Sequence, residues 1–245
     1  MRLEFVDTGN MDLDHKVLGG KGFPRPGTVY ILGHPGVGKT QFTLSYLVHR
    51  AKKGEKGLYI TFIESKEFLL SRCRSFSFYQ DLVRFVEEGI IRIETLKPVY
   101  GFNIQSIYDL LQNITALINQ GEYKNLVIDS VTSLSAYLEP KDVRTLVTQI
   151  SDLTYRKGLT TILIGELPLY GESLSVSFEA FIVDVMIVID YIWVLGTTPR
   201  LTTRLFAVKS RISPIDRTAY EVIIDEDGLR ILGEIIEKHI PFKSG

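Results

Sequence analysis

The sequence contains little of what several classes of protein depend on. It has one cysteine, Cys73, so no intramolecular disulfide can form. Its four histidines are scattered and show no spacing typical of a metal site. No basic start followed by an apolar run precedes the first motif, and the most apolar stretch, residues 181–195, is too short and too polar to span a bilayer. We therefore expect a soluble, cytoplasmic protein with no membrane association.

An excess of charge of either sign is also missing. The chain has 28 basic and 29 acidic residues, a net charge of -1. Such a balance does not favour a long polyanion such as nucleic acid as the ligand, so any polyanion bound is expected to be small. With 245 residues and 45% apolar content, the chain can fill one core. A single domain over residues 1–245 is the expectation.

Strand-like and helix-like segments alternate through the first two thirds of the chain. The polar, glycine-rich start ends in residues 18–27, which predict an extended loop leading into the first strand. The alternation predicts an α/β fold with a mostly parallel central sheet covered by helices on both faces. The predicted strands are 28–32, 57–62, 90–95, 125–129 and 160–165, and the predicted helices are 38–53, 66–76, 103–119 and 141–157.

The pattern changes after Pro168, where strand-like runs follow one another without a long helix between them. We expect these runs to form an antiparallel extension of the sheet. They are residues 182–195, 202–210, 219–224 and 228–232.

One short motif carries the strongest chemical signal, the run Gly33-His34-Pro35-Gly36-Val37-Gly38-Lys39-Thr40. Backbone N–H groups can converge on a phosphate only where side chains do not obstruct them, and the helix that follows adds its positive dipole end. Lys39 supplies positive charge for the β and γ phosphates, and the Thr40 hydroxyl can ligate Mg²⁺. A glycine turn followed by Lys-Thr by chance is the alternative. The position between a strand and a helix favours a nucleoside-triphosphate site over residues 33–41, Gln41 included, with His34 as a bystander in the chemistry.

Two carboxylates at predicted strand ends complete this site. Asp129 ends an apolar run and can hold the metal through water, although strand-terminal aspartates also cap helices. Glu64 ends the run Leu58-Tyr-Ile-Thr-Phe-Ile-Glu64, on the strand predicted at 57–62, and is our candidate for orienting the attacking water. Its alternative is favourable charge at the start of the next helix, with Ser65 as the cap. We expect Glu67 to lie on that helix and face solvent.

These elements, in this order, resemble the RecA superfamily, and more narrowly the KaiC-like ATPases of archaea. Thr8-Gly-Asn-Met-Asp-Leu-Asp14 followed by Leu18-Gly-Gly is similar to the family's first segment. Further similar segments are Thr61-Phe-Ile-Glu64-Ser65, Arg74-Ser75-Phe76 and Lys209-Ser-Arg211.

The resemblance implies a RecA-like P-loop fold and roles for four more residues. Ser75 would lie near the adenine, and Glu166 would close the strand that senses the γ-phosphate. Lys209 and Arg211 would act on the nucleotide of a neighbouring subunit, which implies a homo-oligomer, by analogy a hexameric ring with ATP and Mg²⁺ at its interfaces. The alternative for Lys209 and Arg211 is an alternating strand with a solvated basic face.

The sequence departs from the family pattern in three respects, of which the first bears on the rate of hydrolysis. Ile63 stands where the family motif has the first of two glutamates, so Glu64 would work without an adjacent carboxylate. Ala180 and Phe181 stand where the clock protein has its autophosphorylated residues, which makes autokinase activity unexpected. The chain also has one KaiC-like repeat where the clock protein has two.

Three functions fit these observations. The first is an oligomeric ATPase whose nucleotide state regulates an unknown protein partner. The second is a RadA-paralogue role in DNA recombination or repair, which we do not favour because the loop 168–179 contains two glutamates and no Lys or Arg. The third is a non-hydrolysing ATP switch in a larger machine, such as the archaellum motor, and the presence of Glu64 and Arg211 favours an enzyme over it.

Overall fold

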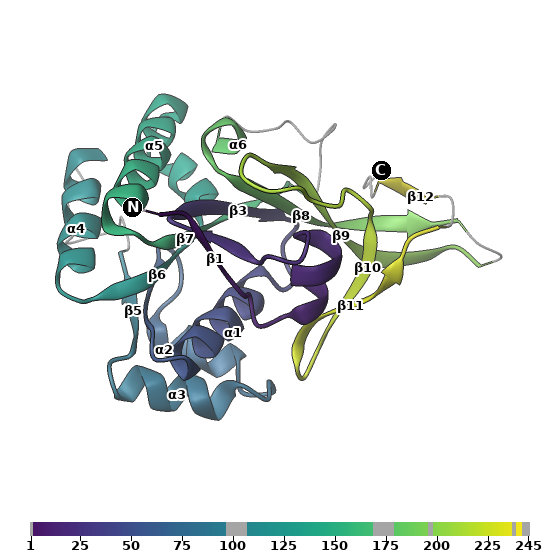
Figure 1. Ribbon diagram of the computed structural model, residues 1–245, viewed down its shortest axis with the longest axis horizontal. Helices are drawn as coiled ribbons and strands as arrows, with labels where there is room; N and C mark the ends of the chain where they lie inside the picture. The colour runs from purple at the N-terminus through teal and green to yellow at the C-terminus, as the bar shows by residue number, and fades with distance from the viewer. Residues whose placement is uncertain (1, 97–106, 169–178, 196–197, 237–238, 242–245) are drawn as a thin grey trace.

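A computed structural model describes residues 2–96, 107–168, 179–195, 198–236 and 239–241 of the chain. Within these residues it contains a large sheet of ten strands with helices on both faces, and a separate sheet of two strands (Figure 1). The strand order in the large sheet is β11-β10-β9-β8-β3-β7-β6-β4-β5, and β12 pairs with β8. The predicted α/β class, with a mostly parallel centre and antiparallel C-terminal strands, is confirmed.

Six parallel strands form the centre of the large sheet, β8 and the five strands given below. Most of their residues are buried, as expected for strands that are covered on both faces. Because the strands are parallel, their carboxyl ends meet at one edge of the sheet and their amino ends at the other. In spatial order the five besides β8 are β3 (Gly27–Gly33), β7 (Thr160–Glu166), β6 (Tyr123–Asp129), β4 (Lys56–Thr61) and β5 (Ile91–Thr95).

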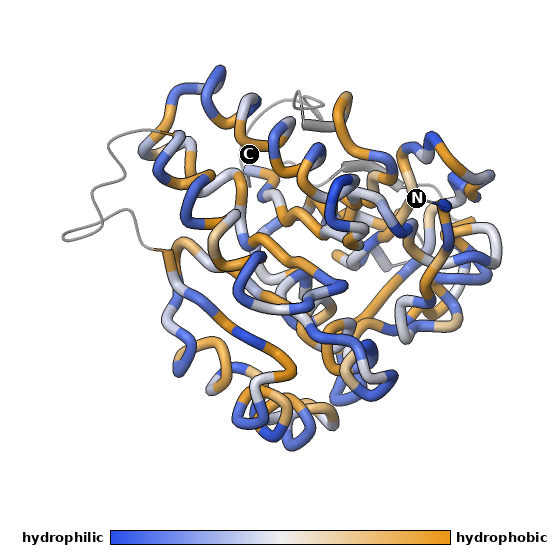
Figure 2. The backbone as a smooth tube through the Cα atoms, turned by 60° about the vertical axis from the view of Figure 1, so that its left-hand side comes forward, coloured by the Kyte–Doolittle hydropathy of each residue, from blue (hydrophilic) through white to orange (hydrophobic). Residues whose placement is uncertain are grey.

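The two faces of the sheet bury two separate hydrophobic clusters, because successive side chains of a strand point to opposite faces. Val29 and Ile31 of β3 pack with α1, α2 and α3, whereas Tyr30 and Leu32 pack with α4 and α5. Figure 2 shows the hydrophobic strands at the centre, enclosed by helices of mixed hydropathy. The helices are α1 (Lys39–Lys52), α2 (Lys66–Arg72), α3 (Tyr79–Glu87), α4 (Ile107–Asn119) and α5 (Pro140–Lys157).

The first strand of the C-terminal region differs from the prediction. It pairs with β3 in the parallel sense, with Val29 opposite Val185 and Gly33 opposite Ile189, and the antiparallel pairing begins only between β8 and β9. The prediction of an antiparallel extension starting at residue 182 was therefore wrong for β8. Its continuous apolar run is typical of a central parallel strand. The C-terminal elements are α6 (Glu179–Ile182), β8 (Val185–Val194), β9 (Arg200–Ser210), β10 (Tyr220–Asp225), β11 (Gly228–Glu234) and β12 (His239–Pro241).

The N-terminal segment is more ordered than the predicted loop. The strands β1 (Glu4–Val6) and β2 (Phe23–Arg25) pair in the antiparallel sense, and a π-helical turn, η1 (Leu13–Val17), lies between them. Leu13 and Val17 are buried in the same cluster as α1. Burial of these few apolar residues orders a segment whose local sequence resembles a loop.

The helix predicted at 66–76 also differs, because α2 ends at Arg72 and a separate helix, α3, follows after a turn. The start of α2 agrees with its sequence signal, since the Ser65 hydroxyl accepts a hydrogen bond from the backbone N–H of Phe68 at 3.3 Å. Glu67 is exposed on this helix, as predicted.

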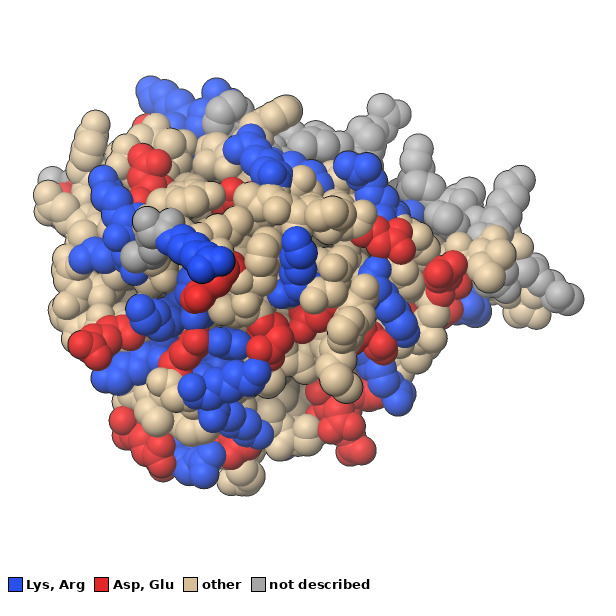
Figure 3. All heavy atoms as spheres, in the orientation of Figure 1, with Lys and Arg blue, Asp and Glu red and all other residues tan. Residues whose placement is uncertain are grey.

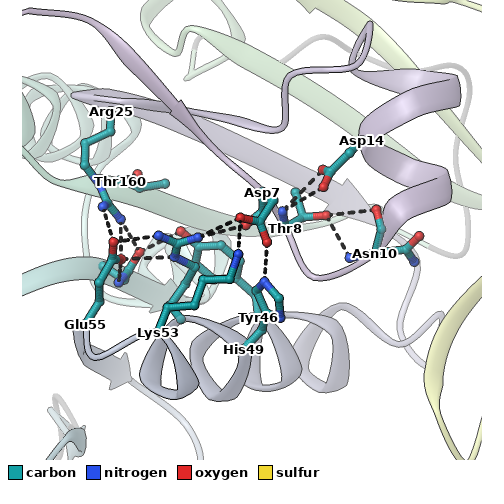
Figure 4. Close-up of polar contacts among 12 residues, drawn as sticks. Asp7, Thr8, Asn10, Asp14, Arg25, Tyr46, His49, Lys53, Glu55 and Thr160 are labelled. Atoms are coloured by element: carbon teal, nitrogen blue, oxygen red, sulfur yellow. Dashed lines mark hydrogen bonds and ion pairs between the residues drawn. The ribbon is translucent and has the colours of Figure 1, made fainter.

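A network of ion pairs lies at the edge of the sheet where the amino ends of the strands meet (Figure 4). Glu55 accepts bidentate hydrogen bonds from Arg25 at 2.7 and 2.8 Å and from Arg50 at 2.5 and 3.0 Å. The Asn125 amide donates a further bond to Glu55 at 3.0 Å. Arg50 also pairs with Asp7 at 3.1 Å. The network connects the N-terminal segment, α1, β4 and β6.

The visible surface carries acidic and basic groups in alternation, without a large area of one sign (Figure 3). This distribution agrees with the net charge of -1. Among the helices that the structure describes, none has the length and apolar content needed to cross a membrane.

Candidate nucleotide-binding site

The P-loop connects β3 to α1 at the edge where the carboxyl ends of the strands meet (Figure 1). Gly36 and Gly38 have φ angles of 84° and 89°, a region that side chains disfavour, and Gly38 is the N-cap of α1. At Gly33 a Cβ atom would lie 2.2 Å from the carbonyl oxygen of Ile189. Glycine at these positions therefore follows from backbone geometry and close strand packing, and the N–H groups of the loop stay unobstructed for an anion.

Lys39 is held against the loop that it follows. Its buried ammonium donates hydrogen bonds to the carbonyl oxygens of Gly33 and His34, each at 2.8 Å. Burial lowers the pKa of Lys39, while the carboxylates of Glu166 and Asp129 act in the opposite direction. A cation with these neighbours is placed for a phosphate bound in the loop.

Thr40 and Asp129 lie side by side, as the sequence predicts. The Thr40 hydroxyl donates a hydrogen bond to Asp129 Oδ2 at 2.8 Å, and the Tyr59 hydroxyl donates to the same oxygen. A hydroxyl and a carboxylate are the ligands with which P-loop proteins hold Mg²⁺ next to nucleotide phosphates. Over the part of the chain that the structure describes, no three His, Cys, Asp or Glu residues form a metal cluster. The Thr40 hydroxyl and the Asp129 carboxylate are groups that fit a magnesium ion bound together with a nucleotide.

A cavity of about 210 Å³ connects these groups with Glu64. Glu64 follows β4, and its backbone N–H donates to the Thr61 hydroxyl at 3.2 Å. The cavity brings together residues from the P-loop, α1, β4 and the segment after it, α2, β6 and β7. Those lining it are Pro35, Gly36, Gly38, Lys39, Thr40, Gln41, Thr61, Ile63, Glu64, Arg72, Asp129 and Glu166.

The Glu64 carboxylate has two differently placed oxygens. Oε1 forms an ion pair with the Arg72 guanidinium at 2.6 Å. Oε2 is buried and has no hydrogen-bond partner among the residues that the structure describes. Burial raises the pKa of Glu64, Arg72 lowers it, and Asp129 and Glu166 raise it further. A carboxylate with a raised pKa in a cavity is typical of groups that handle protons.

Arg72 is the residue that sequence reasoning missed. Its position at the end of a helix that starts just after Glu64 was a usable signal, because helical side chains point back toward the N-terminus.

Of two further residues predicted at the nucleotide site, Glu166 lines the cavity and Ser75 does not. Glu166 ends β7, lies opposite Gly33 in the sheet register and lines the cavity. Its backbone N–H donates to the Thr132 hydroxyl at 3.0 Å. Ser75 is exposed in the turn between α2 and α3 and does not line the cavity. Its place beside the adenine stays a prediction.

His34 has a structural partner on β8. Its Nδ1 accepts a hydrogen bond from the backbone N–H of Tyr191 at 3.1 Å, and the two rings stack at 5.6 Å between centroids. Burial lowers the pKa of His34, Asp190 raises it and Lys39 lowers it. The neutral ring therefore helps to fix the P-loop to β8.

Lys209 and Arg211 lie toward the edge of the sheet where the parallel strands begin, whereas the P-loop of the same chain lies at the edge where they end. Lys209 is opposite Met186, and the Arg211 backbone N–H donates to the Asp184 carbonyl oxygen at 2.9 Å. Asp184 in turn bonds Thr28, at the start of β3, whereas the P-loop follows Gly33 at its end. At about 3.3 Å per residue, the length of β3 between these levels is on the order of 17 Å. The structure does not bring these cations to the nucleotide site of the same chain.

Of two other predicted features, the structure describes one. Residues 169–178 of the loop considered for DNA contacts lie outside the described residues. Ala180 and Phe181 belong to the short helix α6.

A P-loop at the end of a central parallel strand, with an aspartate at the end of a nearby strand bonded to its threonine, defines a RecA-like P-loop nucleotide-binding domain. A family model described as "ATPase: KaiC" matches residues 6–235. The chain belongs to this KaiC family of ATPases.

Relatives of two kinds are similar to the chain. The circadian clock oscillator protein KaiC of Prochlorococcus marinus subsp. pastoris is 26% identical over 195 residues, which are 75% of this chain and 37% of that protein. The UPF0273 protein MK0039 of Methanopyrus kandleri is 26% identical over 94% of this chain and 93% of its own length. Among solved structures, the KaiC-like protein PH0186 of Pyrococcus horikoshii has a TM-score of 0.78 and 27% identity, and the match covers 94% of this chain and all of that one. The chain thus spans only about a third of the clock protein but nearly the whole of the archaeal relatives.

Proposed function

We propose that this protein binds ATP with Mg²⁺ and hydrolyses it slowly, as an oligomer whose sites are shared between subunits. The observation that carries the proposal is the single cavity in which the P-loop, the Thr40–Asp129 pair and Glu64 meet. Family membership supports ATP binding and ATPase activity in general. The geometry adds which residues would do the work.

Each group has a distinct task in this proposal. The N–H groups of the loop and Lys39 bind the phosphates, and Thr40 and Asp129 hold the magnesium ion, directly and through water. When bound, Mg²⁺ supplies positive charge to the β and γ phosphates. Glu64 orients the attacking water and accepts its proton. Ile63 lines the cavity beside Glu64 with a side chain that cannot do either, which supports slow turnover.

The far position of Arg211 supports a site completed by a neighbouring subunit. A P-loop with one lysine and Mg²⁺ leaves developing negative charge under-compensated, and an arginine finger is the usual remedy. Arg211 is exposed, and its guanidinium donates to the carbonyl oxygens of Phe181 and Ile182 in its own chain. Because it cannot reach its own P-loop, any role of Arg211 in hydrolysis requires a second copy of the chain. A ring of six is our proposal for the assembly.

A regulatory role fits the remaining observations. Related proteins carry the name of circadian clock oscillator proteins. We propose that nucleotide state controls assembly or contact with a protein partner.

Mixed oligomers test the shared site. We expect Arg211→Ala to lower ATP turnover by about 10³-fold, the usual contribution of an arginine finger, with nearly unchanged ATP affinity. Glu64→Gln subunits should be inactive because they lack the residue that orients water, although they keep Arg211. Mixing the two variants should therefore restore activity at interfaces where one subunit supplies an intact Glu64 and its neighbour an intact Arg211. Turnover of the mixture is the measurement, with elution volume with and without ATP-Mg²⁺ as the measure of assembly.

Arg217→Ala is the matched control for this experiment. Arg217 is also exposed, and its side chain also donates to a backbone carbonyl, that of Val208 at 3.3 Å. Its replacement should leave turnover unchanged. A mixture of Arg211→Ala and Glu64→Gln with no recovered activity would show that the site is completed within one chain.

A further inference from the structure

Arg72 places a second cation at the nucleotide site, and it comes from the same chain as the P-loop. Helix α2 begins two residues after Glu64, and its side chains point back toward its N-terminus. Arg72, in the last turn, therefore reaches back over the ring of Phe68, 4.6 Å from its centroid, to Glu64. The guanidinium nitrogen lies 2.6 Å from Glu64 Oε1.

Stability alone is a poor explanation for this ion pair. The Arg72 side chain is 50% exposed, and pairs of that kind contribute little to folding. The other carboxylate oxygen, Oε2, is buried without a hydrogen-bond partner among the described residues, an arrangement that costs free energy. The pair thus adds little to stability and leaves one carboxylate oxygen without a partner.

The same geometry limits the access of water to the Glu64 carboxylate. Oε1 is engaged by Arg72, and Oε2 is buried. A general base must reach the proton that it removes, and here the oxygen without a partner is buried while the other is held by Arg72. An attacking water must therefore compete with Arg72 for Oε1, and opening of the ion pair favours hydrolysis.

Resting on the hydrolytic role proposed above for Glu64, we propose that Arg72 is a positioning residue that holds Glu64 withdrawn until nucleotide phosphate attracts the guanidinium away. Arg72 lines the cavity, so a γ-phosphate can compete with the carboxylate for it. Arginine binds phosphate and carboxylate with the same planar set of donors, which makes the exchange chemically matched. The pair thus keeps hydrolysis low and adds to the slow turnover expected with Ile63.

Other charged groups around Glu64 set the direction of the pH effect. Asp129 on β6 and Glu166 on β7 raise the pKa of Glu64, and Arg72 is the neighbour that lowers it. Lys39 on α1 lines the same cavity, and Cys73 is a thiol whose pKa is raised by burial and by Glu64 to about 11. Loss of the Arg72 charge should therefore move the acidic limb of the rate profile to higher pH.

Steady-state hydrolysis by Arg72→Gln is the first test. Because a half-exposed ion pair is worth up to about 1 kcal/mol, its removal should raise kcat on the pH plateau by about two- to fivefold, with the acidic limb moved upward. Arg72→Lys, which keeps the charge, should stay close to the wild type. A kcat that is unchanged or lower in Arg72→Gln overturns the proposal, and so does an acidic limb that does not move.

Arg84→Gln is a closely matched control. Arg84 is 54% exposed, pairs with Asp81 at 2.7 Å and lies 4.6 Å over the ring of Phe85, so it repeats the surroundings of Arg72 away from the cavity. Its loss should change neither kcat nor the pH profile. An equal rise in both variants would show that general loosening is the cause, which contradicts the proposal.

A measurement that does not depend on ATP hydrolysis tests the role of Arg72 separately from the proposed function. The ¹³C carboxyl resonance of Glu64, identified by its loss in Glu64→Gln, should titrate at higher pH in Arg72→Gln than in the wild type. A non-hydrolysable ATP analogue with Mg²⁺ should move the wild-type resonance as the ion pair opens. If neither the Arg72→Gln substitution nor the ATP analogue shifts the resonance, the role of Arg72 is overturned. If the wild type binds ATP but does not hydrolyse it, the proposed function is overturned, and the resonance still tests whether Arg72 holds Glu64.

Discussion

Glu55 and Glu64 stand at opposite edges of the same sheet, and each is bonded to arginine with a different outcome. Glu55, at the amino ends of the strands, receives hydrogen bonds from Arg25, Arg50 and Asn125 on both of its oxygens (Figure 4). Glu64, at the carboxyl ends, has one arginine on one oxygen and an unpartnered second oxygen in the described part of the chain.

Their proton affinities differ in the same way. Burial acts to raise the pKa of Glu55, but the hydrogen bonds from Arg25, Arg50 and Asn125 hold it well below its usual range. At Glu64 burial prevails over Arg72, and the pKa is raised. Full pairing makes a carboxylate part of the fold, whereas partial pairing leaves it available for chemistry.

Replacing Glu55 should have the largest effect on stability. Glu55→Gln keeps the shape but removes the negative charge that compensates the buried Arg25 and Arg50. Loss of one member of a buried ion pair costs about 3–5 kcal/mol, so the free energy of unfolding should fall by that amount. Urea denaturation measures it.

Glu64→Gln is the matched substitution at the other edge and should show the reverse pattern. Its free energy of unfolding should change by no more than about 1 kcal/mol, since its partner is half exposed. Its ATP turnover should fall by about 10²–10⁴-fold, while Glu55→Gln keeps its turnover at temperatures where it is folded. Equal destabilisation by the two variants would contradict the structural role assigned to Glu55 and the chemical role assigned to Glu64.

The pH dependence of the free energy of unfolding should show the difference between Glu55 and Glu64 as a smaller effect. Glu55 and Asp7 have lowered folded-state pKa values, about 2 for Asp7, against ordinary values of 4.5 and 3.8. Because the folded state binds these protons less readily, their contribution to stability is complete above the ordinary values and is lost as the pH falls through and below them. The free energy of unfolding should thus be flat near pH 7 and decline below about pH 5.

Glu55→Gln and Glu64→Gln should change the slope of the free energy of unfolding against pH in opposite directions. Glu55→Gln should decline less steeply in acid, because one of the groups responsible is gone. The raised pKa of Glu64 works in the opposite sense, since its protonation favours the folded state as the pH falls. Glu64→Gln should therefore decline slightly more steeply, and an identical slope for all three proteins would contradict the assignment of these groups.

Local sequence signals were sufficient for the parts of the site that follow strand ends. The P-loop, Asp129 and Glu64 were predicted because parallel strands bring their carboxyl ends to one edge, and the structure places all three around one cavity. Their chemical roles stay predictions, as do the roles of Ser75, Lys209 and Arg211.

Long-range packing decides what the sequence did not show. The Glu55 network joins residues from the N-terminal segment to β6, a combination that no local spacing predicts. Arg72 depends on the direction of one side chain along a helix that was predicted too long. The parallel pairing of β8 depends on the path of the chain across the sheet, and only its continuous apolar run indicated it.

Titration of ATP-Mg²⁺ against the wild type and Lys39→Ala tests most directly whether the carboxyl edge is the nucleotide site. The wild type should bind, and Lys39→Ala should bind at least about 100-fold more weakly, because a buried charged hydrogen bond to phosphate is worth about 3 kcal/mol. Thermal melting of both proteins without nucleotide shows whether Lys39→Ala is folded. Equal affinity of the two folded proteins for ATP would contradict the account.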